Sequence, residues 1–199
     1  LSAPALNQIF ATIGLSLVLQ NIALFLFKAD FRTVKPSYGA LTFIAGEFMF
    51  SFPRVMAFLL AIALIFALFT FLKKTFMGKA IRALAQERRA ATLMGIDVFR
   101  TYQIAFGIGI ACVGAAGAIL IPIFYVYPTV GSLFVLIAFV VVILGGYNSL
   151  VGSLVGGLII GVVEALSGFL VSPHLKEAIY FVIFIFILLF KPTGLFGRR

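Results

Sequence analysis

Residues 54–72 read RVMAFLLAIALIFALFTFL, and no charged side chain follows Arg54 in this stretch. A helix rises about 1.5 Å per residue, so roughly 20 apolar residues cross a hydrocarbon core of about 30 Å. The stretch nearly reaches that length and therefore predicts a membrane-spanning helix.

Further apolar stretches lie on both sides of it, at residues 9–27, 104–124, 129–146, 151–171 and 178–190. The stretches at 129–146 and 178–190 are short, and either could be a broken or re-entrant segment. The whole chain is 63% hydrophobic and only 11% charged, whereas about a quarter of a soluble domain is charged. We therefore expect an all-α, polytopic transmembrane helix bundle of about six spans in a lipid bilayer. It should form one domain over residues 1–199, and because the chain starts at Leu1 rather than Met, we expect an N-terminal part to precede it.

Basic residues are unevenly divided between the two sides that six spans define. One side receives the connecting segment 73–103 and the C-terminal tail. Its basic residues are Lys73, Lys74, Lys79, Arg82, Arg88, Arg89, Arg100, Lys191, Arg198 and Arg199. The other side receives Lys28, Arg32, Lys35, Arg54 and Lys176. Because cytoplasmic loops are enriched in Lys and Arg, the first side is assigned to the cytoplasm. Topology thus explains the net charge of +9, and no nucleic-acid partner is expected.

The longest outer connection covers residues 28–53. Phenylalanines alternate with other residues from Phe48 to Phe52, a pattern of a short strand or of a segment that lies on the membrane surface.

Small residues recur in the spans 104–124 and 151–171, for example at Gly152 and Gly156. Small residues four apart let two helices approach closely in lipid. They indicate either tight packing, within the chain or to a partner subunit, or a surface that slides between transport states.

Polar side chains inside the spans are candidates for a substrate path. Glu164 lies near the middle of the span 151–171, where an acidic residue is costly and should face protein or water. It either lines an internal cavity or is a protonated or hydrogen-bonded structural residue. Gln20 and Asn21 in the first span pose the same question with less force, since both can hydrogen-bond between helices.

Enzyme signatures are missing from the sequence. No G-x-x-x-x-G-K-[ST] phosphate loop is present, and a single histidine, His174, cannot form an H-E-x-x-H zinc site. His174 is expected in an interfacial loop, and Cys112 has no second cysteine for an internal disulfide. We expect no catalytic site, metal or cofactor.

The cytoplasmic stretch GKAIRALAQERRAATLMG, residues 78–95, is rich in good helix formers and ends at Gly95, a natural C-cap. It predicts one short surface helix of about four turns. Ile81, Leu84 and Ala85 would form an apolar patch, and the basic residues would lie on another face. The segment is either a solvated basic loop or a helix that docks into a cytoplasmic partner.

Within it, RAATLMG at residues 89–95 resembles the E-A-A-x-x-x-G coupling-loop motif of bacterial ABC importer permeases. Arg89 stands where that motif has glutamate, which alters the charge presented to an ATPase. Three longer stretches, GKAIRALAQERRAATLMGID (78–97), LGGYNSLVGSLVGGLIIGVVEAL (144–166) and LLFKPTGLFGRR (188–199), resemble the branched-chain amino acid ABC permease family. The likeness is looser before residue 38, where SLVLQNIALFLF (16–27) still fits.

This resemblance implies a multi-pass permease subunit in a bacterial inner membrane that helps to import leucine, isoleucine or valine. The implied partners are cytoplasmic ATP-binding subunits, a second permease subunit and a periplasmic amino-acid-binding protein, which the outer loops would meet. The implied coupling residues are Arg82, Glu87, Arg88, Arg89, Ala90, Ala91 and Gly95. Three alternatives stay open: a permease for urea or short amides, an ion-coupled transporter or channel subunit, and an assembly subunit without its own path.

Overall fold

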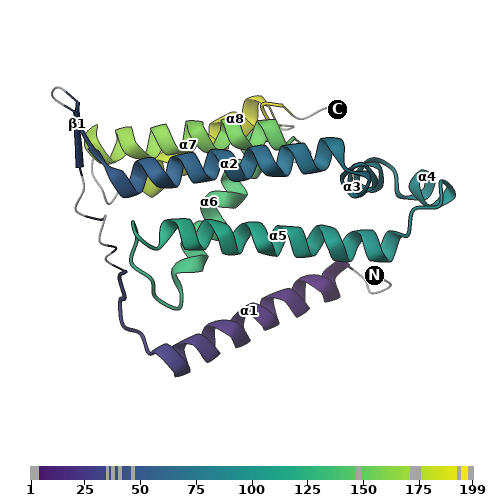
Figure 1. Cartoon of the computed structure of the whole chain (residues 1–199), viewed down its shortest axis with the longest axis horizontal. Helices are drawn as coiled ribbons and strands as arrows, with labels where there is room; N and C mark the ends of the chain where they lie inside the picture. Colours follow the sequence, from purple (N-terminus) through teal and green to yellow (C-terminus); the bar gives the residue numbers. More distant parts are fainter. Residues whose placement is uncertain are drawn as a thin grey trace. The chain divides into compact units, whose positions relative to one another are not determined.

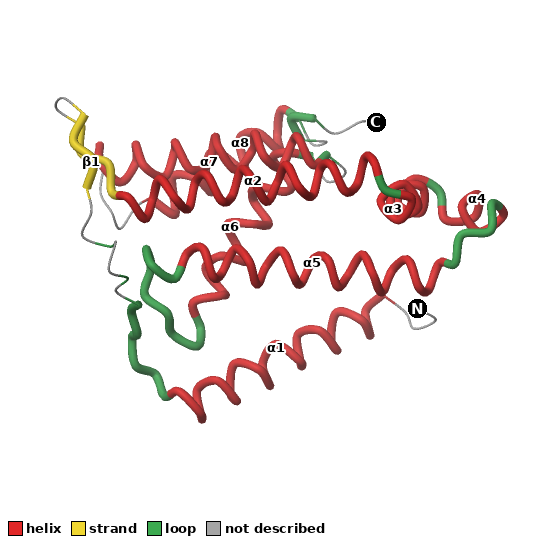
Figure 2. The backbone as a smooth tube through the Cα atoms, viewed as in Figure 1, coloured by secondary structure: helices red, strands yellow, loops and turns green. Residues whose placement is uncertain are grey.

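The computed structural model describes residues 5–34, 36, 39, 42–45, 48–146, 149–170, 176–191 and 194–196 of the chain. These residues are helical apart from one short hairpin and the connections (Figures 1 and 2). The helices are α1 (Ala5–Phe27), α2 (Phe52–Lys74), α3 (Phe76–Gln86), α4 (Arg88–Leu93), α5 (Val98–Leu120), α6 (Val130–Gly145), α7 (Leu150–Leu170) and α8 (Lys176–Phe190), and the strands are β1 (Thr42–Ala45) and β2 (Phe48–Ser51).

Four helices are long and apolar enough to cross a membrane, namely Leu6–Phe27, Phe52–Lys74, Val98–Leu120 and Leu150–Leu170. Their surfaces carry large apolar side chains with nothing over them, such as Phe25 and Phe169, each 87% exposed. Surfaces of this kind are stable in lipid rather than in water. The chain is therefore a multi-pass helical membrane protein. The two remaining apolar helices are shorter, at Val130–Gly145 and Phe181–Phe190, and they coincide with the two spans that the sequence marks as short.

The predicted strand near Phe48 is confirmed as β2, which pairs with β1 in an antiparallel hairpin. The register runs from Thr42 opposite Ser51 to Ala45 opposite Phe48. The strand ends at Ser51, because the next residues begin α2, with a proline in its first turn. Proline is favoured there since its missing N–H would have no helical partner.

The chain groups into two compact units, Leu1–Pro128 and Thr129–Arg199, and each is described by itself. The expectation of a single domain stays a prediction. In the first unit α2 packs against α3 and α5, and α3 packs against α5. Beyond the C-terminal end of α5, the backbones of Arg32 and Val126 exchange two hydrogen bonds of 2.9 and 2.8 Å. This bridge ties the connection after α1 to the connection after α5.

The second unit consists of α6, α7 and α8 around Val140, Leu144 and Ile160, which are 1%, 0% and 1% exposed. The α6–α7 contact depends on glycine, because a Cβ atom on Gly145 or Gly152 would overlap the backbone of the other residue. The small residues at this position therefore serve tight packing within the chain, which is one of the two roles that the sequence leaves open.

Candidate coupling surface and transport path

The connection between α2 and α5 is built by α3, which lies beyond the end of α2, and by α4, which lies beyond the ends of both long helices (Figures 1 and 2). Thr75 separates α2 from α3, and its Oγ1 accepts a 3.0 Å hydrogen bond from the backbone N–H of Gly78. This is the usual N-cap interaction for threonine. A Cβ on Gly78 would overlap the backbone of Phe71 and Leu72. The cap and the glycine together hold α3 close against the end of α2.

The sequence predicts one helix over residues 78–95, and this prediction is wrong. The structure has two helices that are separated by Glu87, whose backbone is extended at φ −151° and ψ 103°. Glu87 loses no backbone hydrogen bond, because its N–H donates to Ala83 at 3.0 Å and its carbonyl accepts from Ala91 at 3.1 Å. The break turns the chain toward α5, which must return beside α2. Helix propensity does not reveal the break at Glu87, since the residues before and after Glu87 are good helix formers.

One face of this segment is buried. Ala80, Leu84 and Ala91 are each 4% exposed, and Thr101 at the start of α5 is equally buried. Since α3 and α4 both contact α5, Ala80, Leu84 and Ala91 belong to the packed side of the segment. The predicted apolar patch is correct for Leu84 and partly for Ile81, but Ala85 is exposed.

The implied coupling residues mostly lie on the opposite, exposed face. Arg82, Glu87, Arg88, Arg89, Ala90 and Gly95 are exposed, whereas Ala91 is buried. The Arg88 guanidinium carbon lies 6.0 Å from the centroid of the Tyr102 ring, which is within the range of a cation–π contact. Apart from Ala91, these residues are available to a partner.

The most exposed apolar side chains of the segment are Leu93 and Met94, at 88% and 83%. They end α4 and point to a role that the sequence analysis missed, because an apolar residue in a helical pattern is ordinarily assigned to the core. The sequence signal applies to Leu93 alone, which lies two residues after the buried Ala91 and therefore off its helix face; Met94, three residues after Ala91, fits the spacing of a buried residue.

The end of α4 has a fixed backbone. The N–H of Gly95 donates to the carbonyl of Thr92 at 3.0 Å, and the N–H of Ile96 donates to Ala91 at 3.2 Å. Gly95 has φ +80°, which confirms it as the C-cap glycine. This pair of bonds and the left-handed glycine constitute a Schellman motif. The motif holds the two residues before it, Leu93 and Met94, in one orientation.

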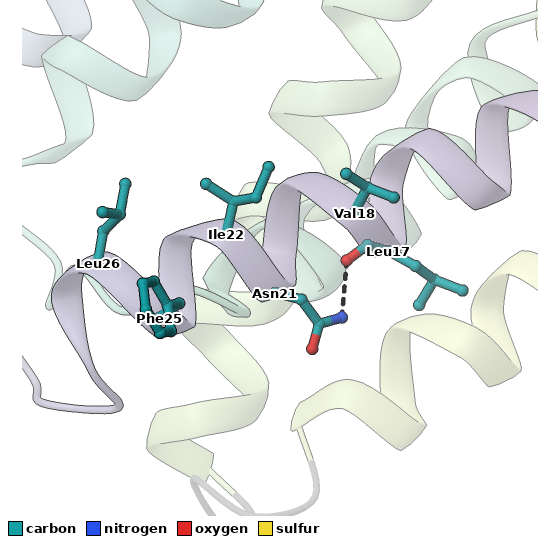
Figure 3. Close-up of a pocket in the computed structure, with 6 residues that line it drawn as sticks. All are labelled: Leu17, Val18, Asn21, Ile22, Phe25 and Leu26. Carbon is teal, nitrogen blue, oxygen red and sulfur yellow. Dashed lines mark hydrogen bonds between the residues drawn. The ribbon is translucent and has the colours of Figure 1, made fainter.

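The candidate path residues Gln20 and Asn21 lie on α1. Asn21 Nδ2 donates to the Leu17 carbonyl at 2.8 Å, within the same helix. Asn21 is also the polar member of an open, otherwise apolar groove along this helix (Figure 3). The groove is lined by Leu17, Val18, Asn21, Ile22, Phe25 and Leu26.

Glu164, the third candidate, is half-buried on α7. Its backbone carbonyl accepts a 3.2 Å hydrogen bond from Ser167 Oγ, which also donates to Val163 at 2.6 Å. Glu164 belongs to the second compact unit, and Gln20 and Asn21 belong to the first. His174, Lys35, Arg198 and Arg199 lie outside the described residues.

Comparison with known proteins gives the family. The model of the permease component of branched-chain amino acid transport systems matches residues 1–188. Over 97% of its length the chain is 31% identical to the high-affinity branched-chain amino acid transport system permease protein BraD of Pseudomonas aeruginosa. Over the same share it is 34% identical to the corresponding protein LivH of Salmonella typhimurium. A probable branched-chain amino acid transport permease protein LivH of Methanocaldococcus jannaschii is 34% identical over 68% of this chain and 45% of its own length.

The chain spans 64% of the length of the BraD and LivH relatives from Pseudomonas and Salmonella. No solved structure matches it at a significant level. The match to the family model nevertheless covers nearly the whole chain, and the chain belongs to the family of branched-chain amino acid transport system permease components.

Proposed function

We propose that the chain is a membrane-spanning permease subunit of an ATP-driven ABC importer that carries leucine, isoleucine and valine into the cytoplasm. The observation that carries the proposal is the family membership, together with relatives that are named as high-affinity branched-chain amino acid permeases. The chain has no phosphate-binding loop of its own, so the energy of ATP must come from another subunit.

In the proposed topology α6 and α8 also cross, which gives about six spans in a bacterial inner membrane. The α3–α4 segment then lies in the cytoplasm, because the stretch 73–103 that contains it carries seven of the fifteen basic residues of the chain. The hairpin and the Arg32–Val126 bridge lie on the outer side, where a periplasmic amino-acid-binding protein would deliver the substrate.

The α3–α4 segment is the proposed contact with the cytoplasmic ATP-binding subunits. It is anchored on one face by buried small residues and exposes Arg82, Arg88 and Arg89 on the other. Closure of two ATP-binding subunits would push this segment and tilt the helices joined to it, and a second permease subunit would complete the path. Rocking of helix bundles around a central site is a general route to alternating access. Gln20, Asn21 and Glu164 are the proposed polar contacts of that path.

The test is co-purification of the full-length protein with its cognate ATP-binding subunits. The intact segment 78–95 is compared with a variant in which its order is scrambled. Binding only to the intact segment, followed by ATP-dependent uptake of labelled leucine, supports the proposal. Absence of binding to the intact protein refutes the proposal. Uptake of urea or a short amide in place of leucine would show that the importer carries that substrate instead.

A further inference from the structure

Leu93 and Met94 form an exposed apolar pair at the end of α4, 88% and 83% exposed. We define them as the α4 tip. An isolated apolar residue on a surface is ordinary, but two adjacent large ones with almost no cover are a feature of binding surfaces. The tip lies among basic residues, so its exposure needs an explanation other than general hydrophobicity of the chain.

Lipid does not explain the exposure of the tip. Lys73 and Lys74 occupy the last turn of α2, and basic residues at a span's end mark the membrane surface. The chain then continues through α3 before α4 begins, and α4 lies beyond the ends of α2 and α5 (Figures 1 and 2). The tip is therefore on the water side of the interface, where large apolar side chains are covered by protein.

The backbone of the tip is preorganised. The Schellman motif at Gly95 fixes the end of α4, and Ala91 of the same helix is buried, at 4% exposed. A partner that takes up Leu93 and Met94 does not have to order this backbone first. Preorganisation of this kind lowers the entropic cost of binding.

Exposed arginines flank the tip along the chain. Arg88 and Arg89 are exposed at the beginning of the same short helix, and Arg100 is exposed just beyond it. An apolar centre with a charged, solvated rim is the usual composition of a protein interface, in which the buried centre supplies most of the affinity. The rim charges mainly raise the association rate and make it sensitive to salt.

We propose that the α4 tip is the apolar anchor that binds a pocket with an acidic rim on the ATP-binding subunit. This inference rests on the proposed function and assigns the affinity to Leu93 and Met94 rather than to the arginines. The arginines Arg88 and Arg89 then steer the encounter.

The experiment uses the full-length permease in lipid nanodiscs and its purified cognate ATP-binding subunits. Leu93→Gln with Met94→Gln is compared with Phe76→Gln, since Phe76 is 80% exposed in the same segment but lies at the membrane end of α3. Glutamine keeps helix propensity. We expect Kd to rise about tenfold or more in the tip variant, which is typical for loss of a buried anchor, and to stay within about twofold in the control. A second arm, Arg88→Gln with Arg89→Gln, should reduce the salt dependence of the association rate.

Unchanged affinity of the tip variant, with wild-type permease still binding, overturns the inference and leaves the proposed function standing. Failure of the wild-type protein to bind refutes the proposed function itself. Leu93→Trp, in the full-length permease with any other tryptophan replaced by phenylalanine, provides a single reporter of the tip's surroundings; residues 1–199 themselves contain no tryptophan. Its emission in the free permease should be that of a water-exposed indole, and strong quenching by brominated lipids would place the tip in the bilayer and overturn the inference.

Discussion

The backbone N–H of Leu195 donates a 2.8 Å hydrogen bond to the carbonyl of Leu144, and Phe196 donates to Gly145 at 3.1 Å. These bonds join the segment after α8 to the end of α6. The last carbonyls of a helix have no partner within it, so this segment satisfies two of them. Lys191 Nζ closes the arrangement with a 2.8 Å bond to the Leu195 carbonyl.

The segment can take this position only because residue 194 is glycine. Gly194 has φ +78°, and a Cβ on it would lie 2.5 Å from the Ile143 carbonyl oxygen and 2.7 Å from the Gly146 nitrogen. We expect Gly194→Ala to destabilise the folded protein by about 1–3 kcal/mol, through a strained backbone and loss of the two bonds. The measurement is thermal unfolding in detergent. The control is Gly161→Ala, where a Cβ meets nothing within 4 Å, and equal melting temperatures in both variants would contradict the prediction.

Gly156 and Gly157 are adjacent on α7 and differ in their surroundings. A Cβ on Gly156 would lie 2.8 Å from the Val141 carbonyl oxygen, whereas a Cβ on Gly157 would make an ordinary 3.6 Å contact with the Val141 side chain. We expect Gly156→Ala to push α7 away from α6 and to lower stability by about 1–3 kcal/mol, as overpacking does. Gly157→Ala should be neutral or slightly stabilising, because helix propensity improves equally in both. Thermal unfolding of the two single variants provides the comparison, which fails if Gly157→Ala is the more damaging.

Thr75 lies between α2 and α3, and its hydroxyl group bonds to both sides of this junction. Its Oγ1 accepts from the Gly78 N–H and donates to the Phe71 carbonyl at 2.7 Å. We expect Thr75→Ala to weaken the first turn of α3 by about 1 kcal/mol. Hydrogen exchange of the α3 amides should become roughly five times faster, while Thr75→Ser should retain the wild-type rate. Faster exchange in both variants would mean that the methyl group, rather than the hydroxyl, holds the junction.

Local structure was predictable where a short stretch of sequence determines it. Gly95 was recognised as a C-cap, and alternation at Phe48 indicated a strand, since both signals are local. The break at Glu87 and the burial of Ala80 were not predictable, because they depend on where α5 packs. The exposure of Leu93 and Met94 was missed for the same reason. A linear pattern gives the period of a helix but not which of its faces a neighbour covers.

Charge on the coupling segment should affect energy transfer more than folding. We expect Arg88→Glu with Arg89→Glu to leave the permease folded, because both side chains are exposed and acidic residues are favourable in the first turn of a helix. The repelled ATP-binding subunits should then hydrolyse ATP without driving uptake. Parallel assays of ATP hydrolysis and leucine uptake in proteoliposomes measure the coupling, and a normal ratio in this variant would contradict the proposed contact.

Glu164 is half-buried in the middle of the apolar helix α7. If it contributes to the substrate path, its carboxyl group matters during transport, since an acidic residue in a membrane is retained where it faces protein or water. Glu164→Gln keeps the size and most hydrogen-bonding capacity of the side chain while replacing the carboxyl group. We expect lower leucine uptake at an unchanged yield of the assembled complex. Asn21→Gln is a milder companion variant, because Asn21 already bonds within its own helix. Intact uptake and intact assembly in Glu164→Gln would leave Glu164 a purely structural residue.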